Sequence, residues 1–422
     1  MRRSLNELYK SIQGIFINNF INLFINQFTN LFVGFWVTRI MFSRLGEETF
    51  GLVNLALSVV MLLSISVSYG YHLNGPKHIT LSENQSQKIQ KVVNQILATR
   101  LIISTLIAIL IFLVSQLLSL SSSFQIILYF SLIILLSEAL FPIFYFQGKD
   151  QLSKLSLANF FAKISYLTLV YFFVKGPENA PWMNFFFGIT SLSVYLVLWI
   201  SIYRKEKIKF YWVQWSEILF RIKENFHYFL SSIGGHINIH GGLIILGFFV
   251  GNSILGKYAL AQKIAFLLRM IPVFFTQAIL QKAVKHKKHH SNTSNKEITH
   301  LYFIGLGSTL LMGILVALFA KWIIYIQGGR FVNYSAGVLQ ILAFIPFLSM
   351  LNFRNMITIL VEEKQVILNK ATWFTAIFMV ITSCFACYFY GGYGLAFALI
   401  ATEIVSYFSH SILLKQHGIK TS

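Results

Sequence analysis

The chain has 422 residues, of which 56% are hydrophobic and only 11% are charged. Soluble domains carry about 25% charged residues, so this composition excludes a soluble globular protein. Apolar runs of about 20 residues recur along the chain, whereas the roughly 10-residue alternating segments typical of a membrane β-barrel do not occur. The sequence therefore predicts an all-α polytopic membrane protein.

The first element is a basic N-terminal segment, residues 1–13, that leads directly into an apolar run. No small-residue cleavage site follows it, so we expect a retained first helix rather than a removed signal peptide. Taken in chain order, the apolar runs predict twelve transmembrane helices at 16–38, 51–73, 101–118, 124–148, 155–174, 182–203, 226–250, 258–281, 301–320, 333–361, 371–390 and 393–413.

The net charge of +20 is distributed unevenly over the segments between these spans. With the N-terminus inside the cell, the inner segments hold 24 Lys and Arg, the outer segments hold six, and four lie within spans. This asymmetry predicts that both termini are cytoplasmic. It also explains the positive charge as a topology signal, with contact to anionic lipid as a further use, and so argues against nucleic-acid binding.

The connecting segments leave no room for a catalytic domain, because the outer ones are short. The run Lys285–His290 in a basic inner segment allows a metal tract, but a solvated turn is the simpler interpretation. The pair Cys384 and Cys387 lies within an apolar run, where packing is favoured over redox or metal chemistry.

The two halves of the chain carry a weak repeat at a constant offset of 205 residues. Gly46 aligns with Gly251, Gly51 aligns with Gly256, and residues 55–56 align with 260–261. The matches fall at the turns after the first and seventh helices. We therefore expect two parallel six-helix lobes, residues 1–209 and 210–422, around a central cavity.

The first helix of each lobe carries polar residues at corresponding positions. Asn19, Asn22, Asn26 and Asn30 recur at spacings of three and four, which places them on one face of a helix. This face can bond to a neighbouring helix or line a lumen, and both interpretations stay open.

The seventh helix carries His236 and His240, four residues apart, between the pairs Gly234-Gly235 and Gly241-Gly242. The glycines favour a bend or a locally unwound stretch that exposes backbone groups to a cavity. The histidines are then candidates for sugar or phosphate contacts or for pH-sensitive groups. A zinc site is disfavoured, because no further ligand residue lies nearby in sequence.

Six charged residues lie within the predicted spans: Lys163, Lys263, Arg269, Arg354, Glu138 and Glu403. A cation near mid-depth costs about 2.5–3.5 kcal/mol on insertion scales, so such a residue should face a cavity or a partner. The excess of cations favours an anionic substrate. Either glutamate can serve as a proton or sodium coupling site, or simply as the partner of a cation.

Two segments resemble motifs of a known family. Residues 68–77 read SYGYHLNGPK, which resembles the Gly-aromatic segment that ends the second helix of O-antigen flippases (Wzx-like polysaccharide transporters). Residues 256–264 read GKYALAQKI, which resembles the segment that opens helix 8 in the same family. The motifs recur more loosely across the wider exporter superfamily that includes multidrug (MATE-type) exporters. Many relatives have an acidic residue just before the Gly-aromatic pair, whereas this chain has Ser68-Tyr69.

The resemblance implies a MATE-like fold and a flippase that moves undecaprenyl-diphosphate-linked oligosaccharide to the periplasmic leaflet of the bacterial inner membrane. It implies no cofactor, with coupling to protons or sodium left open. The partners expected are the lipid-linked substrate, membrane lipid and other polysaccharide-assembly proteins around a monomer.

Within this framework, Arg269 is the best candidate for the diphosphate, because a guanidinium matches two phosphate oxygens at once. Lys263, Arg354 and Lys163 are further cation candidates, although each can instead be an anchor or a paired residue. The alternatives are a multidrug or metabolite exporter on the same fold, and an O-antigen polymerase or membrane glycosyltransferase. The short outer loops with few carboxylates argue against the enzymes.

Overall fold

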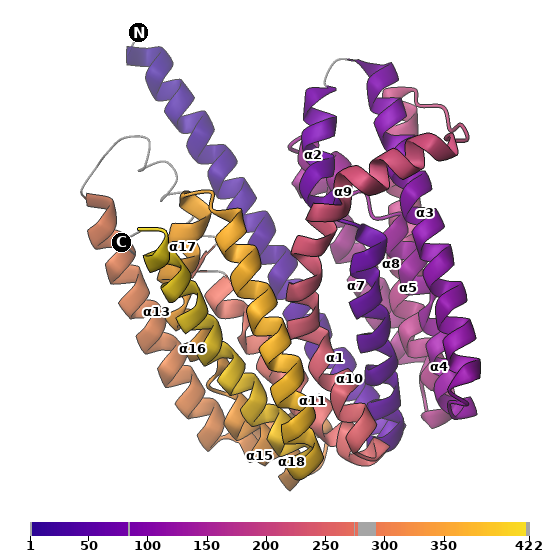
Figure 1. The fold of residues 1–422 in the computed structure, drawn as a ribbon, viewed down its shortest axis with the longest axis vertical. Helices are drawn as coiled ribbons and strands as arrows, with labels where there is room; N and C mark the ends of the chain where they lie inside the picture. The colour runs from indigo at the N-terminus through magenta and orange to yellow at the C-terminus, as the bar shows by residue number, and fades with distance from the viewer. Residues whose placement is uncertain (1, 83–84, 274, 277–292, 419–422) are drawn as a thin grey trace. The chain divides into compact units, whose positions relative to one another are not determined.

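The computed structural model describes residues 2–82, 85–273, 275–276 and 293–418, with side chains from residue 29 and, after the last gap, from residue 299. The regular structure of these residues is helical throughout (Figure 1). The run Lys285–His290, the last residues of the predicted span 258–281, and the side chains of Asn22 and Asn26 lie outside the described part.

The chain divides into two compact units. Unit 1 comprises residues 1–37, 63–175 and 181–230, and unit 2 comprises residues 38–62, 176–180 and 231–422. Two helices belong partly to each unit, α1 (Arg2–Ser68) and α9 (Trp215–His236). The lobe boundary at residues 209 and 210 stays a prediction.

Unit 1 otherwise consists of the helices between residues 71 and 206 (Figure 1). These are α2 (Tyr71–Leu81), α3 (Ser86–Leu117), α4 (Ser122–Ser131), α5 (Ile133–Ala139), α6 (Ile143–Gly148), α7 (Leu152–Phe173) and α8 (Ala180–Glu206). A short 3-10 turn, η1 (Pro177–Asn179), precedes α8.

Unit 2 contains the helices after residue 236, several of them short pieces of one predicted span. They are η2 (Ile237–Gly241), α10 (Gly242–Phe249), α11 (Asn252–Leu268), α13 (Thr293–Leu318), α14 (Ala320–Gly328), α15 (Asn333–Leu342), α16 (Ile345–Leu351), α17 (Phe353–Val361) and α18 (Gln365–Gln416).

Two long helices of the chain, α1 and α18, reverse direction at a glycine. α1 contains Gly46 (φ 75°, ψ 173°), and α18 contains Gly391 (φ 54°, ψ −133°). A Cβ on Gly394 would lie 2.0 Å from the Ala386 carbonyl oxygen. Residues eight apart in a straight helix are separated by about 12 Å, so the chain turns back on itself at Gly391. Both glycines lie where the sequence predicts a loop between two spans.

Among the described residues, nine helices are long and apolar enough to cross a membrane. Those at Thr29–Leu81 and Gln365–Gln416 each cover two predicted spans, whereas the predicted span 258–281 begins in α11 and continues beyond the described residues. The membrane class and the helical architecture are thus confirmed, and the count of twelve stays a prediction.

The aligned turns of the sequence repeat pack directly against each other within unit 2. A Cβ on Gly256 would lie 1.9 Å from the Glu47 carbonyl oxygen, and one on Gly51 would lie 2.4 Å from the Asn252 carbonyl oxygen. Only glycine permits this approach of the two backbones. The Glu47 carboxylate adds side-chain interactions to this contact. It accepts a hydrogen bond from Ser253 (3.0 Å) and forms ion pairs with Lys257 (3.2 Å) and Arg330 (3.0 Å).

The SYGY motif forms a break between α1 and α2. Tyr69 (φ 44°) and Gly70 (φ 74°) are both left-handed, a conformation that glycine adopts without strain. A Cβ on Gly70 would lie 2.5 Å from the Cβ of Tyr228, and the Tyr69 ring stacks on Phe229 with centroids 4.9 Å apart. The motif is therefore the place where α9 packs closely against unit 1.

The predicted bend in the seventh helix is a π turn. η2 keeps the chain helical from α9 into α10, so the backbone widens here and does not unwind. π turns are rare in proteins overall, but those that occur are often located at functional sites.

Candidate functional site

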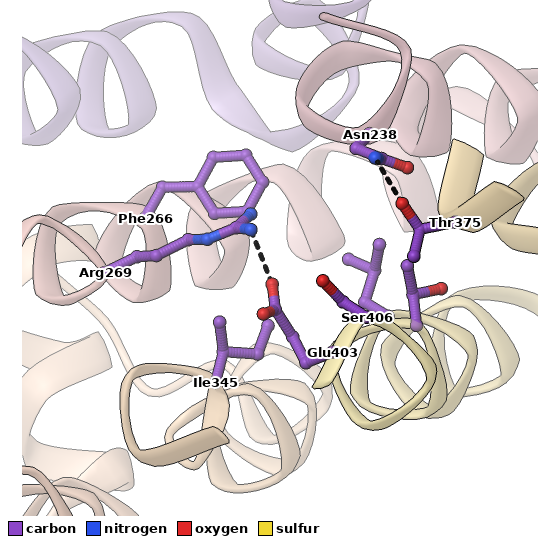
Figure 2. Close-up of a pocket in the computed structure, with 9 residues that line it drawn as sticks. Asn238, Phe266, Arg269, Ile345, Thr375, Glu403 and Ser406 are labelled. Atoms are coloured by element: carbon purple, nitrogen blue, oxygen red, sulfur yellow. Dashed lines mark hydrogen bonds and ion pairs between the residues drawn. The ribbon is translucent and has the colours of Figure 1, made fainter. Parts of the chain in front are cut away.

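A small cavity with polar and apolar lining residues lies within unit 2, where α11, η2, α16 and α18 meet (Figure 2). It holds about 380 Å³ of empty space, including the part open to solvent. Its lining residues are Asn238, Phe266, Arg269, Ile345, Thr375, Leu399, Thr402, Glu403 and Ser406. Four of them come from one face of the second half of α18, at spacings of three and four residues that align side chains on a helix.

Arg269 and Glu403 form an ion pair across this cavity (Figure 2). The Arg269 Nη2 and Glu403 Oε1 atoms are 2.5 Å apart, and the side chains are 31% and 11% exposed. Ser349 Oγ donates a second hydrogen bond of 2.8 Å to Glu403 Oε2. The arginine thus faces a cavity, as its insertion cost predicts. Its partner is the glutamate for which the sequence left both pairing and coupling open.

Asn238 contributes a third polar group to the cavity, from the π turn. Its Nδ2 donates to Thr375 Oγ1 at 3.4 Å, and its buried Oδ1 has no hydrogen-bond partner among the described residues. A buried acceptor without a partner is unfavourable by about 1–3 kcal/mol, so this oxygen is available to a ligand. The sequence contains Asn238 within the polar island between the two histidines, but its place in the site depends on the packing of η2 against α18.

The polar row of α18 continues away from the cavity towards His410. Asn352 Nδ2 contacts Ser406 Oγ (3.4 Å) and His410 Nδ1 (3.3 Å). Next to Asn352, the Arg354 guanidinium lies 5.6 Å from the centre of the Tyr302 ring. Arg354 therefore interacts with an aromatic ring, and it is not among the residues that line the cavity.

The two intramembrane lysines each lie over an aromatic ring. Lys163 Nζ is 4.3 Å from the centre of the Phe187 ring in unit 1, and Lys263 Nζ is 5.5 Å from that of Phe50 in unit 2. A cation over a ring gains about 0.5–2 kcal/mol. No ion pair of either lysine is found among the described residues.

The second intramembrane glutamate, Glu138, is also paired. Its Oε1 lies 3.1 Å from Nη2 of Arg100, whose side chain is only 1% exposed. Arg100 also donates to the carbonyl oxygens of Glu138 and Phe141, the latter at 2.8 Å. The sequence counts Arg100 with an inner loop, whereas the structure places it in the buried part of α3.

The side chain of Ser68 lies beside the Glu138 carboxylate. Ser68 stands where many members of the resembled family have an acidic residue before the Gly-aromatic pair. In this chain a carboxylate from α5 thus reaches the helix break.

The remaining candidates lie near these groups or outside the described side chains. His236 and His240 stack loosely, with ring centroids 5.9 Å apart, and neither is among the residues that line the cavity. Within the described part of the chain, the buried Nδ1 of His236 has no hydrogen-bond partner. Asn30 is partly buried in α1 within unit 1, and its role with Asn22 and Asn26 stays a prediction.

Residues 16–280, more than half of the chain, match the family model described as polysaccharide biosynthesis protein. The chain belongs to this family. A relative from Shigella dysenteriae named "Putative O-antigen transporter" is 24% identical over 86% of this chain and 90% of its own length. One of the same name from Escherichia coli (strain K12) is 22% identical over 72% of this chain and 73% of its own length.

Solved structures show the fold of this family member. A multidrug resistance MATE family transporter of the MOP superfamily has a TM-score of 0.73 and 14% identity, covering 93% of this chain and 94% of its own. The lipid II flippase MurJ has a TM-score of 0.72 and 15% identity, and the match covers 94% of this chain and 87% of the MurJ chain. The predicted MATE-like fold and the resemblance to polysaccharide transporters are confirmed, and with them a transporter in place of an enzyme.

Proposed function

We propose that this protein flips undecaprenyl-diphosphate-linked O-antigen oligosaccharide from the cytoplasmic to the periplasmic leaflet of the bacterial inner membrane. The transport step is alternating access between two lobes, residues 1–209 and 210–422, with both termini cytoplasmic. Membership of the polysaccharide biosynthesis family and relatives named for O-antigen transport support this class of substrate.

The observation that carries the proposal is the Arg269–Glu403 pair in a cavity lined by both polar and apolar side chains. A diphosphate has more negative charge than one carboxylate and offers oxygens that match both arms of a guanidinium. It can therefore compete with Glu403 for Arg269. The hydroxyl of Ser406 can donate to the same anion, whereas a neutral sugar alone would leave the arginine paired.

This exchange suggests how coupling arises. When the diphosphate holds Arg269, Glu403 loses this cationic partner and retains the hydrogen bond from Ser349. A carboxylate in a low-dielectric site without a cation takes up a proton or a metal cation such as sodium. Substrate and coupling ion then favour each other's binding. Glu138 is the second coupling candidate, and its release from Arg100 requires the same kind of exchange in unit 1.

The remaining candidates contact other parts of the substrate. Lys263, Arg354 and Lys163 provide cations along the path of the head group. Asn22, Asn26 and Asn30, with His236 and His240, provide groups for the sugars. The protein acts as a monomer in contact with membrane lipid and other polysaccharide-assembly proteins, without a bound cofactor.

Deletion of the protein tests this function. We expect undecaprenyl-diphosphate-linked O-units to accumulate on the cytoplasmic side and surface O-antigen to disappear, with both restored by the wild-type chain. If surface O-antigen persists and the deletion strain instead becomes sensitive to drugs, the protein is a small-molecule exporter and the proposal is wrong.

A further inference from the structure

The connection between α8 and α9 exposes both basic and aromatic side chains. Arg204, Lys205, Lys207 and Lys209 are all exposed. They lead into Phe210 and Trp212, which are 60% and 81% exposed. This combination is unusual for a solvated turn, because large aromatic rings in water are unfavourable.

The connection is nevertheless held in a fixed position. Ile208 and Val213 are buried, at 7% and 1% exposure. Asn94 Nδ2 donates to the Lys209 carbonyl oxygen, and the Lys209 amide donates to Gln90 Oε1, both at 3.0 Å. The side chains between the two buried residues therefore point outward because the backbone is fixed to α3.

The first half of α9 continues this surface with two different faces. On one face, Arg221 bonds Gln95 (2.8 Å), and Glu217 pairs with Lys91 (2.9 Å), which attaches α9 to α3. The other face exposes Trp215, Leu219, Phe220, Phe226 and Leu230, with Lys223 among them. In Figure 1 this part of α9 runs obliquely across α3.

The length of α9 and its continuation agrees with this placement. The apolar helix at Trp215–Phe249 has 35 residues, which corresponds to about 52 Å, whereas a bilayer core is about 30 Å thick. The helix is therefore longer than it needs to be to cross the bilayer core, and its first turns can lie outside that core. An amphipathic segment with aromatic residues on one side and lysines beside it is typical of the membrane interface.

We propose that residues 204–223 form a binding surface for the head groups of anionic phospholipids, with Phe210, Trp212 and Trp215 inserted between the lipids. The basic side chains can contact the anionic head groups of a leaflet, and the adjacent rings can contact its apolar interior. The surface is distinct from the Arg269 cavity. Because α9 continues into the π turn and unit 2, bound lipid fixes the segment that links the two units.

The test uses the full-length protein in detergent, titrated with brominated phosphatidylglycerol or brominated phosphatidylcholine. Bromine atoms quench tryptophan fluorescence on contact, so quenching reports binding. We expect phosphatidylglycerol to bind much more tightly than phosphatidylcholine. Neutralising three lysines (Lys205→Gln, Lys207→Gln and Lys209→Gln together) should weaken the phosphatidylglycerol affinity on the order of 100-fold, at about fivefold per lysine.

The matched control neutralises three exposed lysines elsewhere, Lys364→Gln, Lys370→Gln and Lys415→Gln, and should keep wild-type affinity.

A second variant, Trp212→Phe with Trp215→Phe, retains the charges and should lose much of the quenching at saturation. Equal affinity for the two lipids would show that the surface does not select anionic head groups and would overturn the proposal. Unchanged phosphatidylglycerol affinity in the triple-lysine variant, or unchanged quenching in the tryptophan variant, would overturn it too.

Discussion

Two ion pairs lie among the predicted membrane spans of this protein, and they account for both intramembrane glutamates. Arg269 pairs with Glu403 and Arg100 with Glu138. Breaking a buried pair by removing one partner typically costs about 3–5 kcal/mol, so each residue of a pair stabilises the position of the other. The difference between the two pairs is access, because Arg269 borders a cavity and is 31% exposed, whereas Arg100 is almost fully buried. Arg269 is therefore the cation that a substrate can reach.

The competition between diphosphate and Glu403 predicts the effect of Glu403→Gln. Glutamine has the shape of glutamate but not its charge, so Arg269 loses its strongest competitor for an anion. We expect the variant to bind inorganic pyrophosphate roughly tenfold more tightly than the wild type, which corresponds to about 1.4 kcal/mol. Titration calorimetry of the purified proteins measures this difference.

The control for this titration is Glu363→Gln, which neutralises an exposed carboxylate of the same unit. It should bind pyrophosphate as the wild type does. Binding to Glu403→Gln that is equal to or weaker than wild type would show that Glu403 does not compete for Arg269.

At the scale of helices, glycines determine where segments meet. Gly46 and Gly391 reverse α1 and α18, and Gly70 lets α9 pack at the break between α1 and α2. The aligned pair Gly51 and Gly256 brings two backbones into contact. The repeat in the sequence predicts that these turns are equivalent, but their direct contact is visible only in three dimensions.

This contact predicts that Gly256→Ala destabilises the protein. The added methyl group would overlap with the Glu47 carbonyl oxygen and force apart the turns that also hold the Glu47 ion pairs. We expect a loss of about 1–3 kcal/mol, the usual effect of overpacking. Thermal unfolding in detergent measures it as a lower Tm.

Gly251 provides the matched control within the same repeat. It has a negative φ of −69°, and a Cβ there would meet nothing within 4 Å. Gly251→Ala should therefore leave the Tm nearly unchanged. A similar fall of Tm in both variants would show that the contact at Gly256 has no special role.

At the scale of the whole molecule, composition and periodicity predict the architecture well, because membrane helices must satisfy their backbone hydrogen bonds internally. The turns at Gly46, Gly251 and Gly391 lie where the sequence places them. The site is less predictable. The sequence identifies Arg269 and Glu403 as two separate candidate residues, and their pairing depends on how α11 and α18 pack. Arg100 resembles a loop residue because it lies at the edge of an apolar run.

The orientation in the membrane is a further whole-molecule prediction, based on the charge asymmetry. Single cysteines at positions 205 and 321, introduced after Cys384→Ser and Cys387→Ser, lie in predicted inner and outer segments. An impermeant maleimide applied to spheroplasts should label position 321 and leave position 205 unlabelled until the membrane is opened. Labelling in the opposite order would reverse the proposed topology.

The central claim is that Arg269 binds the diphosphate of the lipid-linked substrate, and complementation of the deletion strain with Arg269 variants tests it most directly. We expect Arg269→Ala to abolish surface O-antigen although the protein still inserts, Arg269→Lys to restore it in part, and Lys321→Ala, which removes an exposed cation, to restore it fully. Lysine keeps the charge but not the two-armed geometry of the guanidinium, which accounts for the intermediate result. Full surface O-antigen in the Arg269→Ala strain would contradict the account.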